Sequence, residues 1–259
     1  DNLFYDLSKN FKAQTNSDLT QFPAFTSPFI YKMTVPKNYG WNIYNKREDF
    51  SRMCGYQNNN FIESTINSNY EVCPTYPNIV FVPKGSEAQM TLIGSSKFRS
   101  KGRFPVLSYF YNRNNTCIIR CAQPLSGIGY KSIEDINLLK LFWQLKEPHK
   151  KLNIYDARPK INAMVNKARG KGFEDVKDYY FCCFQFLDIP NIHVVRDSLA
   201  KYLDAVRTKH DSVSSLWQTI NSSNWPTYIG LIIQAAIKIS SVYKGKTKIR
   251  VYIMMALIR

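Results

Sequence analysis

Short strand-like runs separated by longer helical stretches are the feature that most restricts the fold of this chain. Each run is rich in β-branched, aromatic or other apolar residues and is bounded by polar or turn-forming ones. The runs are NIVFVP (78–83), FPVLSYFY (104–111), TCIIRCA (116–122), KLNIYDAR (151–158), YYFCCFQFLDI (179–189) and KIRVYIMM (248–255). This alternation indicates an α/β fold.

Three stretches have the spacing of amphipathic helices. The strongest covers residues 225–243, with Asn224 as N-cap and Gly245 just past its end. Its predicted apolar stripe is Trp225, Tyr228, Ile229, Ile232, Ala236, Ile239 and Tyr243. The second covers residues 132–146, capped by Ser132 with Asp135 three residues later. The third covers residues 194–209, with a stripe of Leu199, Tyr202, Leu203 and Val206.

A formal net charge of +16 is the largest departure from ordinary composition. Such a surplus attracts nucleic acid, anionic lipid or a phosphorylated substrate, although many proteins carry basic charge only for solubility. The densest cluster precedes a strand and consists of Lys97, Arg99, Lys101 and Arg103. We expect it on the surface, either facing phosphate or lipid or, as the simpler interpretation, in a solvated loop.

Several kinds of chemistry find no support in the sequence. The six cysteines form no CxxC pair, and none of the three histidines has a second ligand-type residue at a metal spacing. We therefore expect no metal and no cofactor. The longest apolar run, GLIIQAAIKI, is far shorter than the roughly 20 residues that a membrane span needs.

Two further motifs are weak when taken alone. NKARGKGFED has glycines that could approach a phosphate, but it lacks both the Walker and the dinucleotide-binding spacing. His193, Arg196 and Asp197 follow a strand and open a helix, which invites a catalytic interpretation. A histidine satisfied in the core, beside an ion pair at the helix end, is the simpler alternative.

Taken together and in order, several stretches resemble the myotubularin family over about residues 29–248. They are GWNIYNKREDFSRMCG, INSNYEVCPTYPNIVFVP, FRSKGRFPVLSY, IIRCAQPL, YDAR, NKARGKGFED, DIPNIHVVRDSL and SSNWPTYIGLIIQAAIKI. The resemblance implies a protein-tyrosine-phosphatase-like fold, with a mixed central sheet flanked by helices and incomplete at the C-terminus. It also implies that residues 29–259 are the N-terminal part of a phosphatase domain, and that residues 1–28 are a linker and the tail of a lipid-binding PH-GRAM-like domain.

The family implies removal of the 3-phosphate from phosphatidylinositol 3-phosphate or phosphatidylinositol 3,5-bisphosphate, through the cysteine of a signature loop, HCSDGWDR. In a gap-free alignment from GKT, Tyr252 stands at the histidine, Ile253 at the cysteine and Arg259 at the arginine, and only Arg259 matches. A thiolate nucleophile and an acid are needed for this reaction, so we expect the chain to be inactive.

The resemblance also implies which residues bind the phosphoinositide headgroup, which partners the chain has and where in the cell it lies. The substrate-binding positions that survive are Asn166, Asn191 and Ile192. The alternative is that Asn166 and Asn191 only cap or bridge loops. The implied partners are a phosphoinositide or anionic membrane surface, and a homologous myotubularin in a homo- or hetero-oligomer, but no nucleic acid. The implied location is the cytoplasm, peripherally on endosomal membranes.

The end of the chain raises two expectations. The run at residues 248–255 should form a strand in the interior of the sheet, as it does before the signature loop of the family. The sequence could come from a genuine pseudophosphatase scaffold or from a reading frame that fails before the loop. In either case we expect apolar surface to be left uncovered and solubility to be poor.

Overall fold

The computed structural model of the protein describes residues 44–54, 60–111, 116–127, 129–145, 151–241 and 251–255. All the helices and strands within these ranges belong to one structural unit, Lys46–Arg259. The predicted tail and linker at residues 1–28, the boundary near Phe29, and Arg259 lie outside the described residues.

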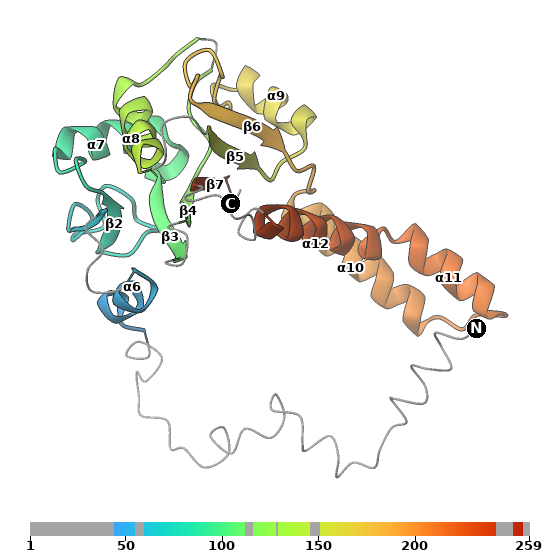
Figure 1. Cartoon of the computed structure of the whole chain (residues 1–259). Helices are drawn as coiled ribbons and strands as arrows, with labels where there is room; N and C mark the ends of the chain where they lie inside the picture. The colour runs from blue at the N-terminus through green and yellow to red at the C-terminus, as the bar shows by residue number, and fades with distance from the viewer. Residues whose placement is uncertain are drawn as a thin grey trace, which may run out of the picture. The chain divides into compact units, whose positions relative to one another are not determined.

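A five-stranded sheet organises this unit, in the order β3-β4-β7-β5-β6. Its strands are β3 (Val106–Tyr111), β4 (Thr116–Cys121), β7 (Val251–Met255), β5 (Leu152–Asp156) and β6 (Cys182–Phe186). β3 runs antiparallel to β4, and the other neighbours are parallel, so the sheet is mixed. β7, the last strand in sequence, lies in the middle of the sheet between β4 and β5, which confirms the predicted interior position (Figure 1).

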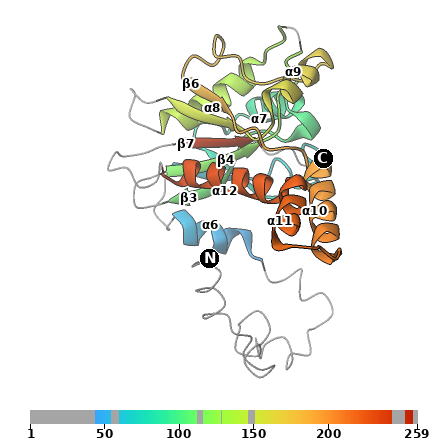
Figure 2. The same ribbon diagram turned by 90° about the vertical axis from the view of Figure 1, so that its right-hand side faces the viewer.

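Helices cover both faces of this sheet (Figure 2). On one face, α7 (Gln89–Phe98) and α8 (Ile133–Gln144) supply Leu92, Leu138 and Phe142 to the main core, where Ile119 and Ile154 of the sheet are also buried. On the other face, α12 (Trp225–Ser241) buries Ile239 against Tyr155 of β5. Because side chains alternate along a strand, Ile154 and Tyr155 serve opposite layers.

A smaller hairpin-like sheet extends the main core. β1 (Phe61–Ser64) pairs antiparallel with β2 (Val80–Pro83), and α6 (Lys46–Cys54) stacks Phe50 on Phe81 with ring centroids 3.7 Å apart. Phe61 contacts the ring of Phe110 in β3 edge to face. The two sheets therefore share one apolar core.

The remaining helices are α9 (Lys160–Ala168), α10 (Ile192–Arg207) and α11 (Val213–Ser222), and a 3-10 turn, η1, spans Ser100–Gly102. The predicted α8 starts as expected, because Ser132 Oγ accepts a hydrogen bond from Asp135 N at 3.2 Å. The helices α10 and α12 also lie where they were predicted, although α10 begins two residues earlier. Four helices of 9 or 10 residues, α6, α7, α9 and α11, were not predicted, since such short segments carry little periodic signal.

The predicted apolar stripes of two helices are partly wrong. On α12, Ile232 and Ala236 are exposed, and the buried positions are Ala235 and Ile239. On α10, Leu203 and Val206 are exposed, whereas Ser198 and Ala205 are buried. Small residues at the contact let these helices approach their neighbours closely, which turns the larger side chains outward.

Exposed apolar side chains occur on α10, α11 and α12. They include Leu203, Val206, Val213, Trp217, Ile233 and Ile237. That truncation leaves a contiguous apolar surface uncovered stays a prediction. Poor solubility of the isolated chain stays a prediction.

Gly102 occupies a position that no other residue fits well. Its φ of +70° lies in the left-handed region, and a Cβ placed there would be 2.3 Å from the carbonyl oxygen of Val72. We expect Gly102→Ala to lower the free energy of unfolding by about 2 kcal/mol, measured by urea denaturation. Gly230→Ala is the matched control, because a Cβ at Gly230, within α12, would meet no atom within 4 Å. This control should be neutral or stabilising by up to about 1 kcal/mol, and equal destabilisation by both changes would contradict the prediction.

Candidate functional site

The carboxyl ends of four parallel strands meet at one edge of the main sheet. In register, Met255 of β7 lies beside Cys121 of β4 and Asp156 of β5, and Asp156 lies beside Phe186 of β6. Ligands of open α/β sheets bind at this edge, where loops and helix N-termini follow the strands. The loops after β5 and β6 are joined here by two main-chain hydrogen bonds, from Leu187 N to Asp156 O and from Ile189 N to Ala157 O.

A pocket of about 450 Å³ opens between these loops and the helices that follow them. It brings together the three predicted substrate-binding residues, Asn166 from α9 and Asn191 and Ile192 from the start of α10. Arg158, Arg169 and His193 also line it. The pocket therefore has polar and cationic groups at the sheet edge that favours ligands.

The end of α9 fixes the position of Asn166. Gly170 adopts a φ of +78°, and two hydrogen bonds, from Gly170 N to Lys167 O and from Lys171 N to Asn166 O, close the helix in a Schellman motif. Gly170, the first glycine of NKARGKGFED, therefore caps the end of α9, and this role explains the glycine without a bound phosphate. The main-chain oxygen of Asn166 serves the cap, whereas its side chain makes no hydrogen bond within the described residues.

Asn191 has a structural role as well as a place in the pocket. Its Oδ1 accepts hydrogen bonds from His193 N at 2.9 Å and Val194 N at 3.1 Å, so it is the N-cap of α10. Asn191 therefore caps α10, as the alternative expected, and it also lines the pocket. The cap occupies the amide oxygen and leaves the amide nitrogen as a donor.

Two further groups of the pocket are Arg169, which sequence reasoning missed, and His193, which it singled out only as a catalytic candidate. Arg169 lies at the C-cap of α9, and His193 lies in the first turn of α10. His193 is exposed, so the alternative of a histidine satisfied in the core is wrong. The predicted ion pair is present, with Arg196 Nε 3.7 Å from Asp197 Oδ1, and both of its side chains are exposed. The position of His193 directly after a strand and a loop was the available signal.

Arg158 forms the floor of the pocket rather than a free cation. Its side chain is buried, and its Nη2 donates to Asp156 Oδ2 at 2.6 Å and to Gly172 O at 2.9 Å. Nη1 donates to Gln123 Oε1, and Nε also bonds the carboxylate of Asp156. The motif YDAR therefore places a paired arginine where β5 ends.

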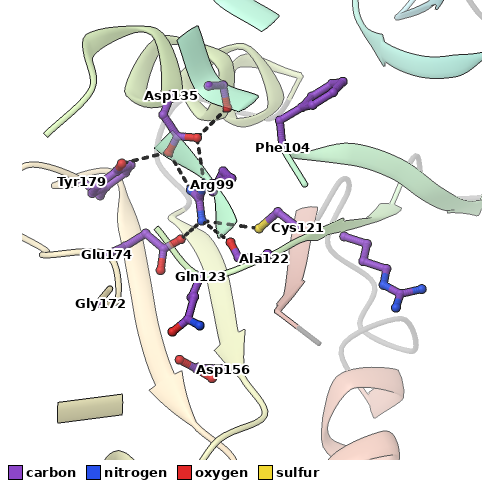
Figure 3. A network of polar contacts seen from close by, with 12 residues as sticks. Arg99, Phe104, Cys121, Ala122, Gln123, Asp135, Asp156, Gly172, Glu174 and Tyr179 are labelled. Atoms are coloured by element: carbon purple, nitrogen blue, oxygen red, sulfur yellow. Dashed lines mark hydrogen bonds and ion pairs between the residues drawn. The ribbon is translucent and has the colours of Figure 1, made fainter. Parts of the chain in front are cut away.

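Arg99, predicted on the basic surface, is instead buried in the core, so that prediction is wrong. Its guanidinium lies at the centre of a polar network (Figure 3). Nε and Nη2 donate to the two oxygens of Asp135 at 2.8 and 2.6 Å, and Nη1 donates to Ala122 O and to Glu174 Oε1. Asp135 also accepts from Ser95 Oγ at 2.6 Å and from the Tyr179 hydroxyl at 2.9 Å.

The charges of this network are unequal, with one guanidinium facing two carboxyl groups. Burial raises the pKa of Glu174 above its ordinary value, and the Arg99 charge opposes that shift. Among the described residues, Oε2 of Glu174 is buried without a hydrogen-bond partner. Burial also raises the pKa of the Cys121 thiol strongly, so this sulfur near the strand end is not a ready thiolate.

Both buried arginines hold the segment between α9 and β6. Arg99 bonds the carboxyl group of Glu174, and Arg158 bonds the carbonyl of Gly172. Because this segment follows directly on the end of α9, the two arginines fix the wall of the pocket that carries Asn166 and Arg169.

The other predicted residues lie away from this pocket. Lys97 and Lys101 are exposed, and Arg103 is half-buried with its Nε bonded to Thr75 Oγ1 at 2.8 Å. Ile253 lies within β7, paired in register with Ile119 and Ile154. The position aligned with the family cysteine is therefore part of an extended strand.

The described residues contain no group of three or more histidine, cysteine or acidic side chains that could hold a metal ion. Within the same part of the chain, no helix is long and apolar enough to cross a membrane. The pocket supplies amide donors, a guanidinium and an imidazole, a set suited to hydroxyl and phosphate oxygens.

The chain is similar in sequence to known proteins over most of its length. Residues 26–253 match the family model of the myotubularin-like phosphatase domain. The chain is 43% identical over 205 residues to human phosphatidylinositol-3,5-bisphosphate 3-phosphatase MTMR8, covering 79% of this chain and 29% of that protein. It is 40% identical over 198 residues to phosphatidylinositol-3,5-bisphosphate 3-phosphatase MTMR6 of Caenorhabditis elegans, covering 76% of this chain and 29% of that protein.

A third relative is named for a different substrate, phosphatidylinositol 3-phosphate. The chain is 40% identical over 201 residues to human phosphatidylinositol-3-phosphate phosphatase MTMR7, covering 78% of this chain and 30% of that protein. The chain thus spans about 30% of the length of these relatives.

Proposed function

Because the chain belongs to the myotubularin family, we propose that its pocket binds the inositol phosphate headgroup of a phosphoinositide, and that this chain does not itself remove the 3-phosphate. The observation that supports binding is the pocket, which gathers Asn166, Asn191 and Ile192 at the carboxyl edge of the sheet. We further propose that the mixed sheet is of the protein-tyrosine-phosphatase type.

Binding in this pocket would rest on hydrogen bonds to the hydroxyl and phosphate oxygens of the headgroup. The side-chain amide of Asn166 and the amide nitrogen of Asn191 can donate to inositol hydroxyls or phosphate oxygens, each contributing about 1 kcal/mol. Arg169 and His193 would add charge-assisted hydrogen bonds to phosphate. Because YIMMALIR stands where the family has HCSDGWDR, we expect the affinity to be weak.

Asn166→Ala should weaken binding of inositol 1,3-bisphosphate by about fivefold, because one donor to the headgroup is lost and its side chain makes no hydrogen bond that would break within the described part of the chain. NMR titration of the full chain measures this. Asn191→Ser is a companion variant, since serine keeps the cap of α10 but lacks the amide donor. Asn221→Ala, an exposed position on α11, is the control and should change nothing. Equal affinity in Asn166→Ala and wild type would refute the proposed pocket.

The proposed inactivity is supported by Ile253, which has no nucleophilic atom and lies in a strand. A phosphate-release assay with phosphatidylinositol 3-phosphate and with phosphatidylinositol 3,5-bisphosphate should give no turnover above the blank. Turnover on either lipid would overturn this part of the proposal.

A second candidate is a scaffold that pairs with an active homologous myotubularin. The apolar side chains exposed on α11 and α12, including Trp217, Ile233 and Ile237, favour it. Co-purification of the chain with such a homologue would support the scaffold, and Ile237→Asp should then abolish it. For either candidate we propose a cytoplasmic location, peripheral on endosomal membranes, which fluorescence microscopy of the tagged chain tests.

A further inference from the structure

The helix α9 turns its apolar side toward solvent. Ile161, Met164 and Val165 are 75%, 55% and 49% exposed, and their spacing puts them on one face of the helix. Ala163, on the opposite face, is fully buried. A surface helix of a soluble domain normally has the reverse arrangement, with its large apolar residues facing the core.

This apolar face is continuous with the mouth of the pocket. On a helical wheel, Asn162, Asn166 and Arg169 lie between the apolar face and the buried face, on the side that lines the pocket. Val165 belongs to both the apolar face and the pocket lining. Two further pocket residues from neighbouring helices, Ile192 and Ile232, are 64% and 40% exposed.

Cationic residues border the same face. Lys160 and Lys167 lie along its side away from the pocket, and Arg169 borders its pocket side. The sequence of α9, KINAMVNKA, contains no acidic residue. An apolar strip between cations is the arrangement of helices that lie in the interface of an anionic bilayer.

We infer that α9 and the pocket mouth contact the surface of an anionic lipid bilayer through a membrane face consisting of Ile161, Met164, Val165, Ile192 and Ile232. The inference rests on the proposed function, since a lipid headgroup stays attached to its acyl chains and its pocket must open toward the bilayer. The apolar side chains would enter the headgroup region while the lysines meet anionic phosphates. Membrane binding would then have an apolar component that salt does not screen, beside the salt-sensitive contribution of the net charge of +16.

Ile161→Asp tests this surface against Val213→Asp. Both positions lie in the first turn of a helix, where an acidic residue is tolerated, and their exposures are similar, 75% and 71%. The full chain is floated with vesicles of phosphatidylcholine and phosphatidylserine containing phosphatidylinositol 3-phosphate, at low and at high salt. Ile161→Asp should reduce vesicle binding about tenfold at both salt concentrations, and Val213→Asp should stay within about twofold of wild type.

A neutral variant and a soluble ligand complete the experiment. Met164→Gln changes no charge and should still reduce vesicle binding about threefold. Affinity for soluble inositol 1,3-bisphosphate, which has no acyl chains, should stay unchanged in Ile161→Asp and Met164→Gln. Circular dichroism verifies that each variant is folded, and Met164→Gln carries the test alone if Ile161→Asp does not fold.

The outcomes separate this inference from the proposed function. Unchanged flotation of Ile161→Asp and Met164→Gln overturns the membrane face, as does an equal loss in Val213→Asp. A change in oligomeric state in place of a change in flotation assigns the face to a protein contact and also overturns it. If wild type binds vesicles through this face but binds no soluble headgroup, the proposed pocket fails while the membrane face stands.

Discussion

Replacing Arg99 with methionine is expected to lower the free energy of unfolding by about 3 to 5 kcal/mol, enough to prevent folding of a marginally stable chain. Methionine fills similar space but leaves Asp135 and Glu174 buried without their cation. It also removes a donor to Ala122 O. Removing one partner of a buried ion pair costs far more than the pair itself contributes, because the remaining charge keeps its desolvation penalty.

The loss should depend on pH in a defined direction. The pKa of Glu174 is already raised by burial, and Arg99→Met removes the charge that opposes the shift. The folded variant then binds protons more tightly than the unfolded chain, so its stability rises as the pH falls from 7 toward the unfolded carboxyl pKa of about 4.3. We therefore expect the difference between wild type and variant to be smaller at pH 5.5 than at pH 7.

Urea unfolding followed by tryptophan fluorescence measures both effects. Arg47→Met is the matched control, because Arg47 makes a bidentate ion pair with Glu63 at the surface, where solvent screens the charges, and its loss should change stability far less. Glu174→Gln should also be mild, since the amide keeps an acceptor for Arg99 and removes the surplus charge. A loss of less than 1 kcal/mol in Arg99→Met would show that the network contributes little.

The contrast between Arg99 and its sequence neighbours shows what a single sequence can and cannot predict. Lys97, Arg99 and Lys101 look alike in the sequence, as alternating cations before a strand. Only the fold brings Arg99 to Asp135 and Glu174, which lie 36 and 75 residues away along the chain. Charge patterning reports local composition and carries no information about such distant pairing.

The strands β2 to β7 were predictable because dense β-branched and aromatic runs have few alternatives to a buried strand, whereas β1 was missed because FIES is short and half polar. The start of α8 was predictable because Ser132 is a local cap. The faces of α10 and α12 were not, since Ala205 and Ala235 at the contacts are small and carry no hydrophobic signal of their own. In the pocket, the resemblance supplied Asn166 and Asn191. Arg169 was missed because nothing local marks a residue as lining a cavity between two distant loops, whereas His193 was singled out only as a catalytic candidate, from its place after a strand.

Replacing Arg158 with methionine should have the second large effect, on both stability and the pocket. Asp156, buried at the end of β5, would lose its cation, and Gln123 Oε1 and Gly172 O would lose their donors. We expect a loss of about 3 to 5 kcal/mol in the free energy of unfolding. Arg158→Lys should be intermediate, because one ammonium cannot reproduce the guanidinium geometry that serves three partners at once.

The exposed pair of Arg196 and Asp197 provides the control for charge alone. Its atoms are 3.7 Å apart in solvent, so Arg196→Met should change stability by less than about 0.5 kcal/mol. Urea unfolding and NMR titration with inositol 1,3-bisphosphate give stability and binding separately for each variant.

Arg158 should also affect headgroup binding, so the binding affinity is a second measurement that tests this prediction. Its bond to Gly172 O holds the segment that follows α9, so its loss should release the wall that carries Asn166 and Arg169. In Arg158→Lys, the variant more able to fold, binding of inositol 1,3-bisphosphate should fall more than about fivefold, the effect expected from losing the Asn166 side chain alone. If binding survives in a folded Arg158→Lys at wild-type strength, the α9 wall is held by other contacts, and Arg158 stabilises the edge of the sheet without positioning the pocket.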